Sequence, residues 1–144
     1  MPKIYLLGAG VTNIKKTEAL EFIIKGLQNN EEKMKIFTPN PEIIMFAQKD
    51  KSFKQIINSA DLALPDGIGV LWGAKILGKQ LQERITGVDF MEMLCKEAAK
   101  RGFTVGLLGA GPKIAEAAAE CLLAKYPGLK VAFIAEEWPK PSKV

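Results

Sequence analysis

The sequence predicts an α/β protein with a mainly parallel sheet and helices on both of its faces. The first observation is alternation, because short apolar segments that end at glycine or proline turns are separated by segments with helical periodicity. The second is composition: 144 residues, 48% of them hydrophobic and 25% charged, are enough for one core without disulfide or metal staples. Strands that alternate with helices favour parallel pairing, since each crossover helix returns the chain to the same edge of the sheet.

The first half of the chain contains three predicted strands and four predicted helices. Short apolar runs bounded by Gly, Pro or Asn predict strands over residues 4–7, 34–37 and 62–64. Apolar residues at helical spacing predict helices over residues 20–27, 41–49, 53–60 and 67–77. Asn40 is a good N-cap for the second of these helices, because Pro41 suits the first helical position and Glu42 suits the positive helix end.

The second half continues the alternation. Thr86 and Asp89 resemble a capping box that begins a helix, and Gly102 is a typical residue to close it. A strand over 104–108, an alanine-rich helix ending at Tyr126 and a last strand over 130–134 follow. Residues 1–135 are therefore predicted to form one core domain. Residues 136–144 have no periodicity and are predicted to be a loose tail.

One short motif occurs twice. Residues 6–10, Leu-Leu-Gly-Ala-Gly, recur as residues 107–111. The repeat predicts two strand-to-helix turns of one nucleotide-binding architecture. Neither copy is a full dinucleotide fingerprint, since the third glycine is replaced by Asn13 in the first copy and by Ile114 in the second.

Composition excludes several classes of mechanism and partner. The chain has no histidine, so it contains no Ser-His-Asp triad, no Cys-His pair and no His-ligated zinc. Cys95 and Cys121 lie far apart without metal-ligand spacing, and we predict two buried, reduced thiols and no metal site. Twenty basic against 16 acidic residues give a net charge of +4, which suits anionic small molecules or a membrane surface but is too weak for a nucleic-acid binder. No apolar run has transmembrane length, which predicts a cytoplasmic chain, with the inner face of the cell membrane as a further position.

Ligands of open parallel sheets bind beyond the carboxyl ends of the strands, and four loops qualify by position. These loops are residues 8–10, 38–42, 65–69 and 109–111. The loop Gly109-Ala110-Gly111 is the best candidate to hold a phosphate, since glycines let the backbone approach an anion at a helix N-terminus. The alternative is a turn that needs glycine for its geometry alone. Glu136 and Glu137 follow the next strand and could hold a ribose.

Asp66 is the most suggestive carboxylate, because it follows a buried strand and lies between Pro65 and Gly67. It is a candidate general base, and the alternative is a Pro-Asp-Gly turn with a purely conformational role. The loop at 38–42 offers the Thr38 hydroxyl and the Asn40 amide, with simple helix capping as the alternative. Arg84 could clamp a diphosphate or be a surface ion-pair residue.

Five segments of the chain form a recognisable set when taken in order. They are Thr38-Pro39-Asn40-Pro41-Glu42, Leu64-Pro65-Asp66-Gly67-Ile68-Gly69, Glu83-Arg84-Ile85-Thr86-Gly87-Val88-Asp89, Leu107-Leu108-Gly109-Ala110-Gly111 and Tyr126-Pro127-Gly128. This order is typical of the WecG/TagA/CpsF glycosyltransferases, and the chain resembles that family from Thr38 to Gly128. The resemblance implies a Rossmann-like, inverting, metal-independent transferase without a cofactor. Such an enzyme moves a sugar, typically N-acetylmannosamine, from a UDP-sugar to a polyprenyl-diphosphate-linked acceptor in teichoic acid or cell-surface polysaccharide synthesis.

The resemblance also implies residue roles. Asp66 would be the general base, Thr38 and Asn40 would position a sugar beside it, and Gly67 would line the substrate site. Arg84 would contact the diphosphate, and Gly109, Ala110 and Gly111 would line the nucleotide pocket. Family members continue through further strands to a basic, membrane-contacting segment, so the chain is expected to be the N-terminal part of such an enzyme, with an exposed sheet edge.

The sequence is also compatible with two alternatives to an active transferase. One is a nucleotide-binding fragment without activity alone. The other is an NAD-type oxidoreductase built on the two glycine turns, against which the missing third glycine argues. The sequence leaves the donor sugar, the acceptor and a homo-oligomeric state open.

Overall fold

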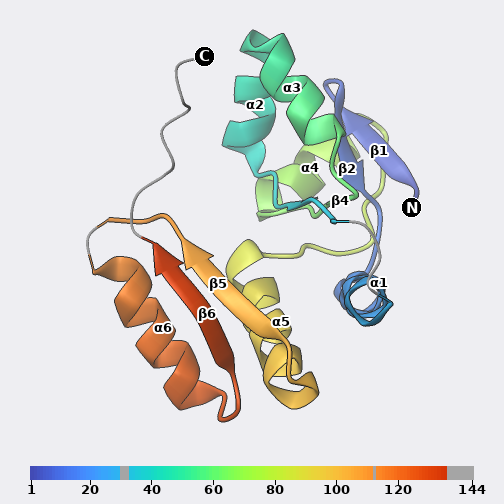
Figure 1. Cartoon of the computed structure of the whole chain (residues 1–144). Helices are drawn as coiled ribbons and strands as arrows, with labels where there is room; N and C mark the ends of the chain where they lie inside the picture. Colours follow the sequence, from blue (N-terminus) through green and yellow to red (C-terminus); the bar gives the residue numbers. More distant parts are fainter. Residues whose placement is uncertain (30–32, 112, 136–144) are drawn as a thin grey trace. The chain divides into compact units, whose positions relative to one another are not determined.

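The computed structural model describes residues 1–29, 33–111 and 113–135. Within them the chain forms two units, Met1–Phe90 and a second unit that begins at Met91 (Figure 1). Helices alternate with short strands in both units, and two of the three strand pairs are parallel, which confirms the predicted α/β class. The predicted tail over 136–144, with Glu136 and Glu137, lies outside the described residues.

The first unit opens with a β-hairpin, which corrects the prediction of a strand-to-helix turn at the first Leu-Leu-Gly-Ala-Gly copy. Strand β1 (Lys3–Leu6) pairs antiparallel with β2 (Ala9–Thr12), so Ala9 and Gly10 lie in a strand. The two turn residues, Leu7 and Gly8, have φ angles of 51° and 81°. Positive φ at both central positions is typical of the tight hairpin turn whose twist matches that of its strands.

The hairpin is held by residues 58–63, which are the end of a helix and the strand that follows it. The side chain of Asn58 accepts from the Gly10 N–H at 2.7 Å and donates to the Gly8 carbonyl at 3.0 Å. The Lys3 ammonium donates to the Ala60 carbonyl at 2.6 Å. Thr12 is fully buried, and its hydroxyl oxygen accepts from the Ala63 N–H at 2.9 Å. These bonds satisfy polar groups that the short strands would otherwise leave unpaired.

The rest of the first unit contains a short parallel strand pair and four helices, close to the predicted ranges. Strands β3 (Ile36–Phe37) and β4 (Leu62–Ala63) pair in parallel. The helices are α1 (Lys16–Gln28), α2 (Pro41–Lys49), α3 (Lys51–Asn58) and α4 (Ile68–Ile76). Asn40 caps α2 as predicted, and the Asp50 side chain caps α3.

One core cluster joins the hairpin to α2 and α4. Its buried residues are Leu6, Ala9, Val11, Ile44, Val70, Ala74 and Leu81. The predicted apolar face of α1 is confirmed at Ile23 and Ile24, whereas Leu27, expected on the same face, is exposed.

Helix α5 (Gly87–Arg101) begins in the first unit and leads into the second. Strand β5 (Thr104–Leu108) then pairs in parallel with β6 (Lys130–Ala135), and α6 (Ile114–Lys125) connects them. The pairing shifts by one residue between Val105 and Gly106. In the described residues β5 pairs with β6 alone, so each strand has one unpaired edge, as expected from the sequence.

The helices of the second unit share one face of this strand pair. Val105 and Leu107 of β5 pack in one cluster with residues of both helices, among them Cys95 of α5 and Leu122 of α6. The opposite face carries Phe133, which is 56% exposed. Its ring lies over Gly106, where a Cβ atom would be 2.3 Å from the ring edge. Glycine at 106 therefore makes room for Phe133 across the pair.

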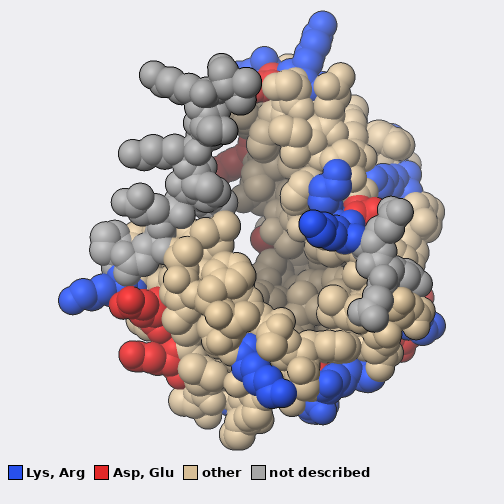
Figure 2. All heavy atoms as spheres, viewed as in Figure 1, with Lys and Arg blue, Asp and Glu red and all other residues tan. Residues whose placement is uncertain are grey.

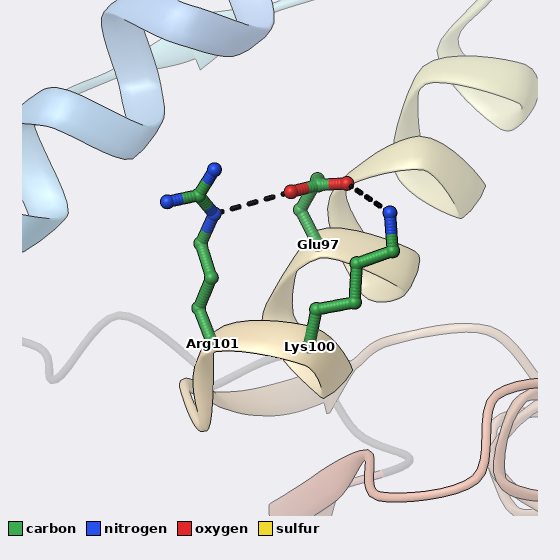
Figure 3. Close-up of polar contacts among 3 residues, drawn as sticks. All are labelled: Glu97, Lys100 and Arg101. Carbon is green, nitrogen blue, oxygen red and sulfur yellow. Dashed lines mark hydrogen bonds and ion pairs between the residues drawn. The ribbon is translucent and has the colours of Figure 1, made fainter.

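The last turn of α5 carries a small ion-pair cluster (Figure 3). The Glu97 carboxylate accepts from Lys100 at 2.9 Å and from Arg101 at 3.1 Å. The hydrogen bond from Lys100, followed by that from Arg101, lowers the pKa of Glu97. Both cations also suit the negative end of the helix, and Gly102 closes it at a φ of 76°.

The two cysteines differ in environment. Cys95 is buried as predicted, and burial, with a smaller effect of the Glu92 charge, raises the pKa of its thiol. Cys121 is exposed, so the prediction that both thiols are buried is wrong for this residue. It lies on the exposed side of α6, next to the buried Leu122.

Candidate functional site

Asp66 lies where the strand pair of the first unit ends. The Leu64 N–H donates to the Phe37 carbonyl at 2.7 Å, and the Asp66 N–H donates to the Pro39 carbonyl at 3.2 Å. These bonds continue the β3–β4 pairing into the loops and hold the Asp66 turn against residues 38–40. Gly67 follows at a φ of 89°, a conformation that glycine adopts without strain. Two of the predicted ligand loops therefore meet at one edge, as expected for parallel strands.

Thr38, Asp66 and Gly87 converge at this edge. The Gly87 N–H donates to Oδ2 of Asp66 at 3.2 Å. A Cβ atom at Gly87 would lie 3.1 Å from the Thr38 hydroxyl oxygen and 3.4 Å from the same Asp66 oxygen. Thr38 and Asp66 are both half-buried. A hydroxyl, a carboxylate and a backbone donor at the start of α5 therefore share a small space.

Asn40 lies two residues from Thr38, and only the oxygen of its side-chain amide has a hydrogen bond among the described residues. Its Oδ1 atom accepts from the Ile43 N–H at 2.9 Å, which is an N-cap bond. Its Nδ2 group has no hydrogen-bond partner among the residues that the structure describes. Capping therefore explains the oxygen and leaves the amide N–H₂ available to a ligand.

Arg84 is exposed, and its backbone runs beside the Asp66 turn. The Ile85 N–H donates to the Pro65 carbonyl at 2.9 Å, which fixes the backbone beside Arg84 to the turn. Neighbouring Glu83 is engaged elsewhere, since it pairs with Lys16 at 3.4 Å. Within the described ranges Arg84 has no hydrogen bond or ion pair, so its guanidinium is free to bind an anion.

The loop at 109–111 belongs to the second unit and is described by itself. The Gly109 N–H donates to the Ala135 carbonyl at 2.9 Å, so it extends the strand pair and is not free for a phosphate. The N–H groups of Ala110 and Gly111 have no backbone partner among the described residues. Ala110 has a φ of 66°, which is strained for a residue with a Cβ atom. This second copy is a strand-to-helix turn, as predicted, between β5 and α6.

The comparison with known families decides the chain's identity. Residues 4–142 match the model of the glycosyl transferase WecG/TagA/CpsF family. The chain belongs to this family.

Curated relatives within the WecG/TagA/CpsF family share one name, N-acetylglucosaminyldiphosphoundecaprenol N-acetyl-beta-D-mannosaminyltransferase. The relative from Bacillus spizizenii is 33% identical over 108 residues, covering 75% of this chain and 42% of the relative. The relative from Staphylococcus aureus is 31% identical over 131 residues, covering 90% of this chain and 52% of the relative. The chain thus spans about half the length of these relatives or less.

Two glycines of this WecG/TagA/CpsF chain make close contacts around the Asp66 turn, although the sequence analysis gave neither of them a role. Gly87 was part of a family segment and of a predicted helix start, where the Thr86 hydroxyl donates to the Asp89 carboxylate. Gly69 packs on Pro41, and a Cβ atom there would lie 2.8 Å from the proline ring. A glycine directly after a predicted N-cap was the available signal at 87. Its contact with Asp66 depends on tertiary structure.

The charges of this WecG/TagA/CpsF chain are dispersed. Figure 2 shows Lys and Arg side chains scattered over the visible face rather than gathered in one stripe. No group of three or more Cys, Asp or Glu side chains in the described ranges is arranged to hold a metal ion. No helix among the described residues is long and apolar enough to span a bilayer.

Proposed function

We propose that the chain carries the catalytic base and donor-binding elements of a sugar transferase. The donor is a UDP-sugar, with N-acetylmannosamine as the sugar, and the acceptor is a polyprenyl-diphosphate-linked N-acetylglucosamine. The products serve teichoic acid or cell-surface polysaccharide synthesis at the inner face of the membrane. The names of the relatives support the sugar and the acceptor. The donor nucleotide, inversion and metal independence extend this proposal from the family resemblance.

The observation that carries the proposal is the setting of the Asp66 carboxylate. One oxygen, Oδ2, accepts from the Gly87 N–H. The other oxygen, Oδ1, has no hydrogen bond within the described part of the chain. A carboxylate with one oxygen oriented by the backbone and one oxygen open is well suited to take a proton from an acceptor hydroxyl.

The proposed step is a single displacement. Asp66 Oδ1 takes the proton of the acceptor hydroxyl as its oxygen attacks the anomeric carbon of the donor sugar. The bond from that carbon to the diphosphate oxygen breaks, and UDP leaves with the electron pair. Attack opposite to the leaving group inverts the anomeric centre. Arg84 stabilises the negative charge that grows on the diphosphate.

The other residues position the substrates. Thr38 lies within reach of the same space as the Asp66 carboxylate, so its hydroxyl is proposed to bind a sugar hydroxyl beside the base. Asn40 offers its Nδ2 donors on the same loop. Gly67 adds no side chain to this edge, and its φ of 89° is a conformation that favours glycine. In the second unit, the open N–H groups of Ala110 and Gly111 are proposed to bind the nucleotide.

The experiment is a thermal-shift comparison of UDP, UMP and NAD on the 144-residue chain. UDP at 100 times its dissociation constant should stabilise the protein by roughly 2.7 kcal/mol. Arg84→Gln should reduce the UDP effect more than the UMP effect, because it removes the diphosphate contact. Arg101→Gln is the matched control, since Arg101 is paired with Glu97 far along α5. Stabilisation by NAD and none by UDP would contradict the proposal.

The oxidoreductase alternative loses part of its basis. It depended on two glycine turns, and the first of them is the tip of the β1–β2 hairpin. The alternative of a nucleotide-binding fragment without catalytic activity differs from the proposed transferase only in the absence of sugar transfer. It predicts UDP binding together with no sugar transfer under any condition, including addition of the C-terminal half of a relative.

A further inference from the structure

Helix α4 exposes an unusual amount of apolar surface. Ile68, Trp72 and Ile76 lie four residues apart and therefore on one face, and they are 52%, 66% and 84% exposed. The next residue, Leu77, is also exposed. The opposite face is buried in the core of the first unit through Val70 and Ala74. Surface helices normally turn polar residues outward, so an outer face of this kind marks an interaction site.

The surface beside this face is hollowed and basic. A hollow of about 530 Å³ is lined by α4 and the segment after it. Its apolar lining is Ile68, Leu71, Trp72 and Leu81, and its charged lining is Lys75 and Lys79, with no acidic residue. The α4 face is defined here as Ile68, Trp72, Lys75, Ile76, Leu77 and Lys79.

The other side of α4 is apolar as well. A smaller hollow between α4, α2 and the hairpin turn is lined by residues without charge. Exposed Leu7 and Met45 line it together with Leu77. The apolar surface therefore continues from α4 to the hairpin tip, which is broader than a groove for a single side chain.

The positive charges of Lys75 and Lys79 distinguish between possible binding partners of the α4 face. Lys75 has no ion pair within the described ranges, and the Lys79 ammonium donates to the Tyr5 carbonyl at 2.6 Å. A second copy docked face to face would bring like charges together in an apolar contact, which is unfavourable. An anionic surface would instead pair with both lysines while the apolar side chains are buried. Trp and Lys are the residues that suit a membrane interface, since one end of each is apolar and the other polar.

We propose that the α4 face docks on an anionic lipid bilayer. Trp72, Ile68 and Ile76 enter the boundary between headgroups and acyl chains, and Lys75 and Lys79 contact lipid phosphates. Helix α4 begins two residues after Asp66. This step rests on the proposed function: docking would bring the candidate base close to the layer in which the lipid-linked acceptor lies. This surface is separate from the transfer chemistry, and its binding can be measured without activity.

The test is binding of the 144-residue chain to phosphatidylglycerol and phosphatidylcholine vesicles. Trp138→Phe leaves Trp72 as the only tryptophan, because the chain has two. Phosphatidylglycerol vesicles should shift the Trp72 emission to shorter wavelength, and acyl-chain-linked quenchers should reduce it. The partition coefficient should fall about tenfold or more in Ile76→Ser and roughly fivefold in Lys75→Gln.

Matched variants make the result specific. Leu27→Ser removes an exposed apolar residue of α1, and Lys96→Gln removes a lysine of α5, so both should bind like the parent. Asp66→Asn should also bind normally, which separates this proposal from the transfer mechanism. Sedimentation should show the same mass for the parent and Ile76→Ser.

Three outcomes would overturn the proposal. The first is no binding to phosphatidylglycerol vesicles, and the second is binding that Ile76→Ser and Lys75→Gln leave unchanged. The third is a parent dimer that Ile76→Ser dissociates, because the α4 face would then be covered by a second copy.

Discussion

The Gly87 N–H donates to Oδ2 of Asp66 at 3.2 Å, across 21 positions of the sequence. This bond joins the turn after β4 to the first residue of α5. The bond orients the carboxylate through Oδ2 and leaves Oδ1 without a hydrogen bond in the described part of the chain. The Thr38 hydroxyl oxygen lies close to the space that a side chain at 87 would occupy. Glycine at 87 therefore leaves room for the three groups to meet, and a Cβ atom there would crowd both side chains.

Gly87→Ala should reduce transfer more than stability. The new Cβ atom would lie 3.1 Å from the Thr38 oxygen and 3.4 Å from Asp66, so both groups must shift by a few tenths of an ångström. We expect a loss of kcat of about tenfold, since misplaced catalytic groups lose rate steeply. Alanine in a helix is favoured over glycine by about 0.5–1 kcal/mol, which offsets the crowding in a urea titration.

Gly73→Ala is the control for that variant. A Cβ atom at Gly73 would meet nothing within 4 Å beyond its own helix backbone and chain neighbours, so the change should stabilise the protein and leave transfer unchanged. Full kcat in Gly87→Ala would contradict the proposed effect of crowding at this position.

Variants at Asn40 should separate capping from substrate binding. Asn40→Ala removes the acceptor of the Ile43 N–H and should cost about 1 kcal/mol of unfolding free energy. Asn40→Ser keeps an N-cap oxygen but lacks Nδ2, so it should keep stability and raise KM for sugar substrates. Thermal unfolding and steady-state kinetics on the same samples measure the two effects. Unchanged kinetics in Asn40→Ser would mean that Asn40 only caps α2 and does not bind substrate.

Acid should weaken the start of α3. The Ser52 hydroxyl, followed by the Phe53 N–H, donates to the Asp50 carboxylate and lowers its pKa. A carboxyl whose folded pKa lies below its unfolded value contributes stability above the unfolded pKa and loses it as the pH falls through the folded one. Stability should therefore decline below roughly pH 4.

Asp50→Asn keeps a good N-cap and cannot titrate, so its unfolding free energy should fall less steeply below that pH. Urea titrations of both proteins between pH 2.5 and pH 6 provide the comparison. Parallel curves would mean that Asp50 has no part in the acid sensitivity.

The sequence predicted the elements of this fold well where local signals agree. Asn40 and Pro41 mark the start of α2, and Gly102 marks the end of α5, because capping depends on a few neighbouring residues. Parallel pairing of β3 with β4 also made the meeting of Thr38 and Asp66 predictable, since parallel strands end at one edge.

The two Leu-Leu-Gly-Ala-Gly copies mark the limit of local signals. The first continues into Val11 and Thr12, β-branched residues that favour a strand, and forms a hairpin. The second continues into an alanine-rich segment and leads into α6. The five shared residues are compatible with both outcomes. The residues that follow, together with the anchoring of the hairpin by Asn58, decide between them.

The role of Gly87 could not be predicted from the sequence pattern, for a different reason. Its contacts with Thr38 and Asp66 arise only when three loops fold together. Likewise, no periodicity predicts that the outer face of α4 stays exposed, because an apolar helix is ordinarily taken for a buried one.

The most direct test of the account is the rate of sugar transfer by Asp66→Asn. The assay follows N-acetylmannosamine transfer from its UDP-sugar to a short-chain prenyl-diphosphate-linked N-acetylglucosamine. It uses the 144-residue chain alone and mixed with the C-terminal half of the Staphylococcus aureus relative. If Asp66 is the base, the parent transfers the sugar and Asp66→Asn loses roughly 100-fold or more of that rate, with unchanged thermal stability and UDP binding. Transfer by Asp66→Asn within twofold of the parent, or none by the parent in either preparation, would contradict it.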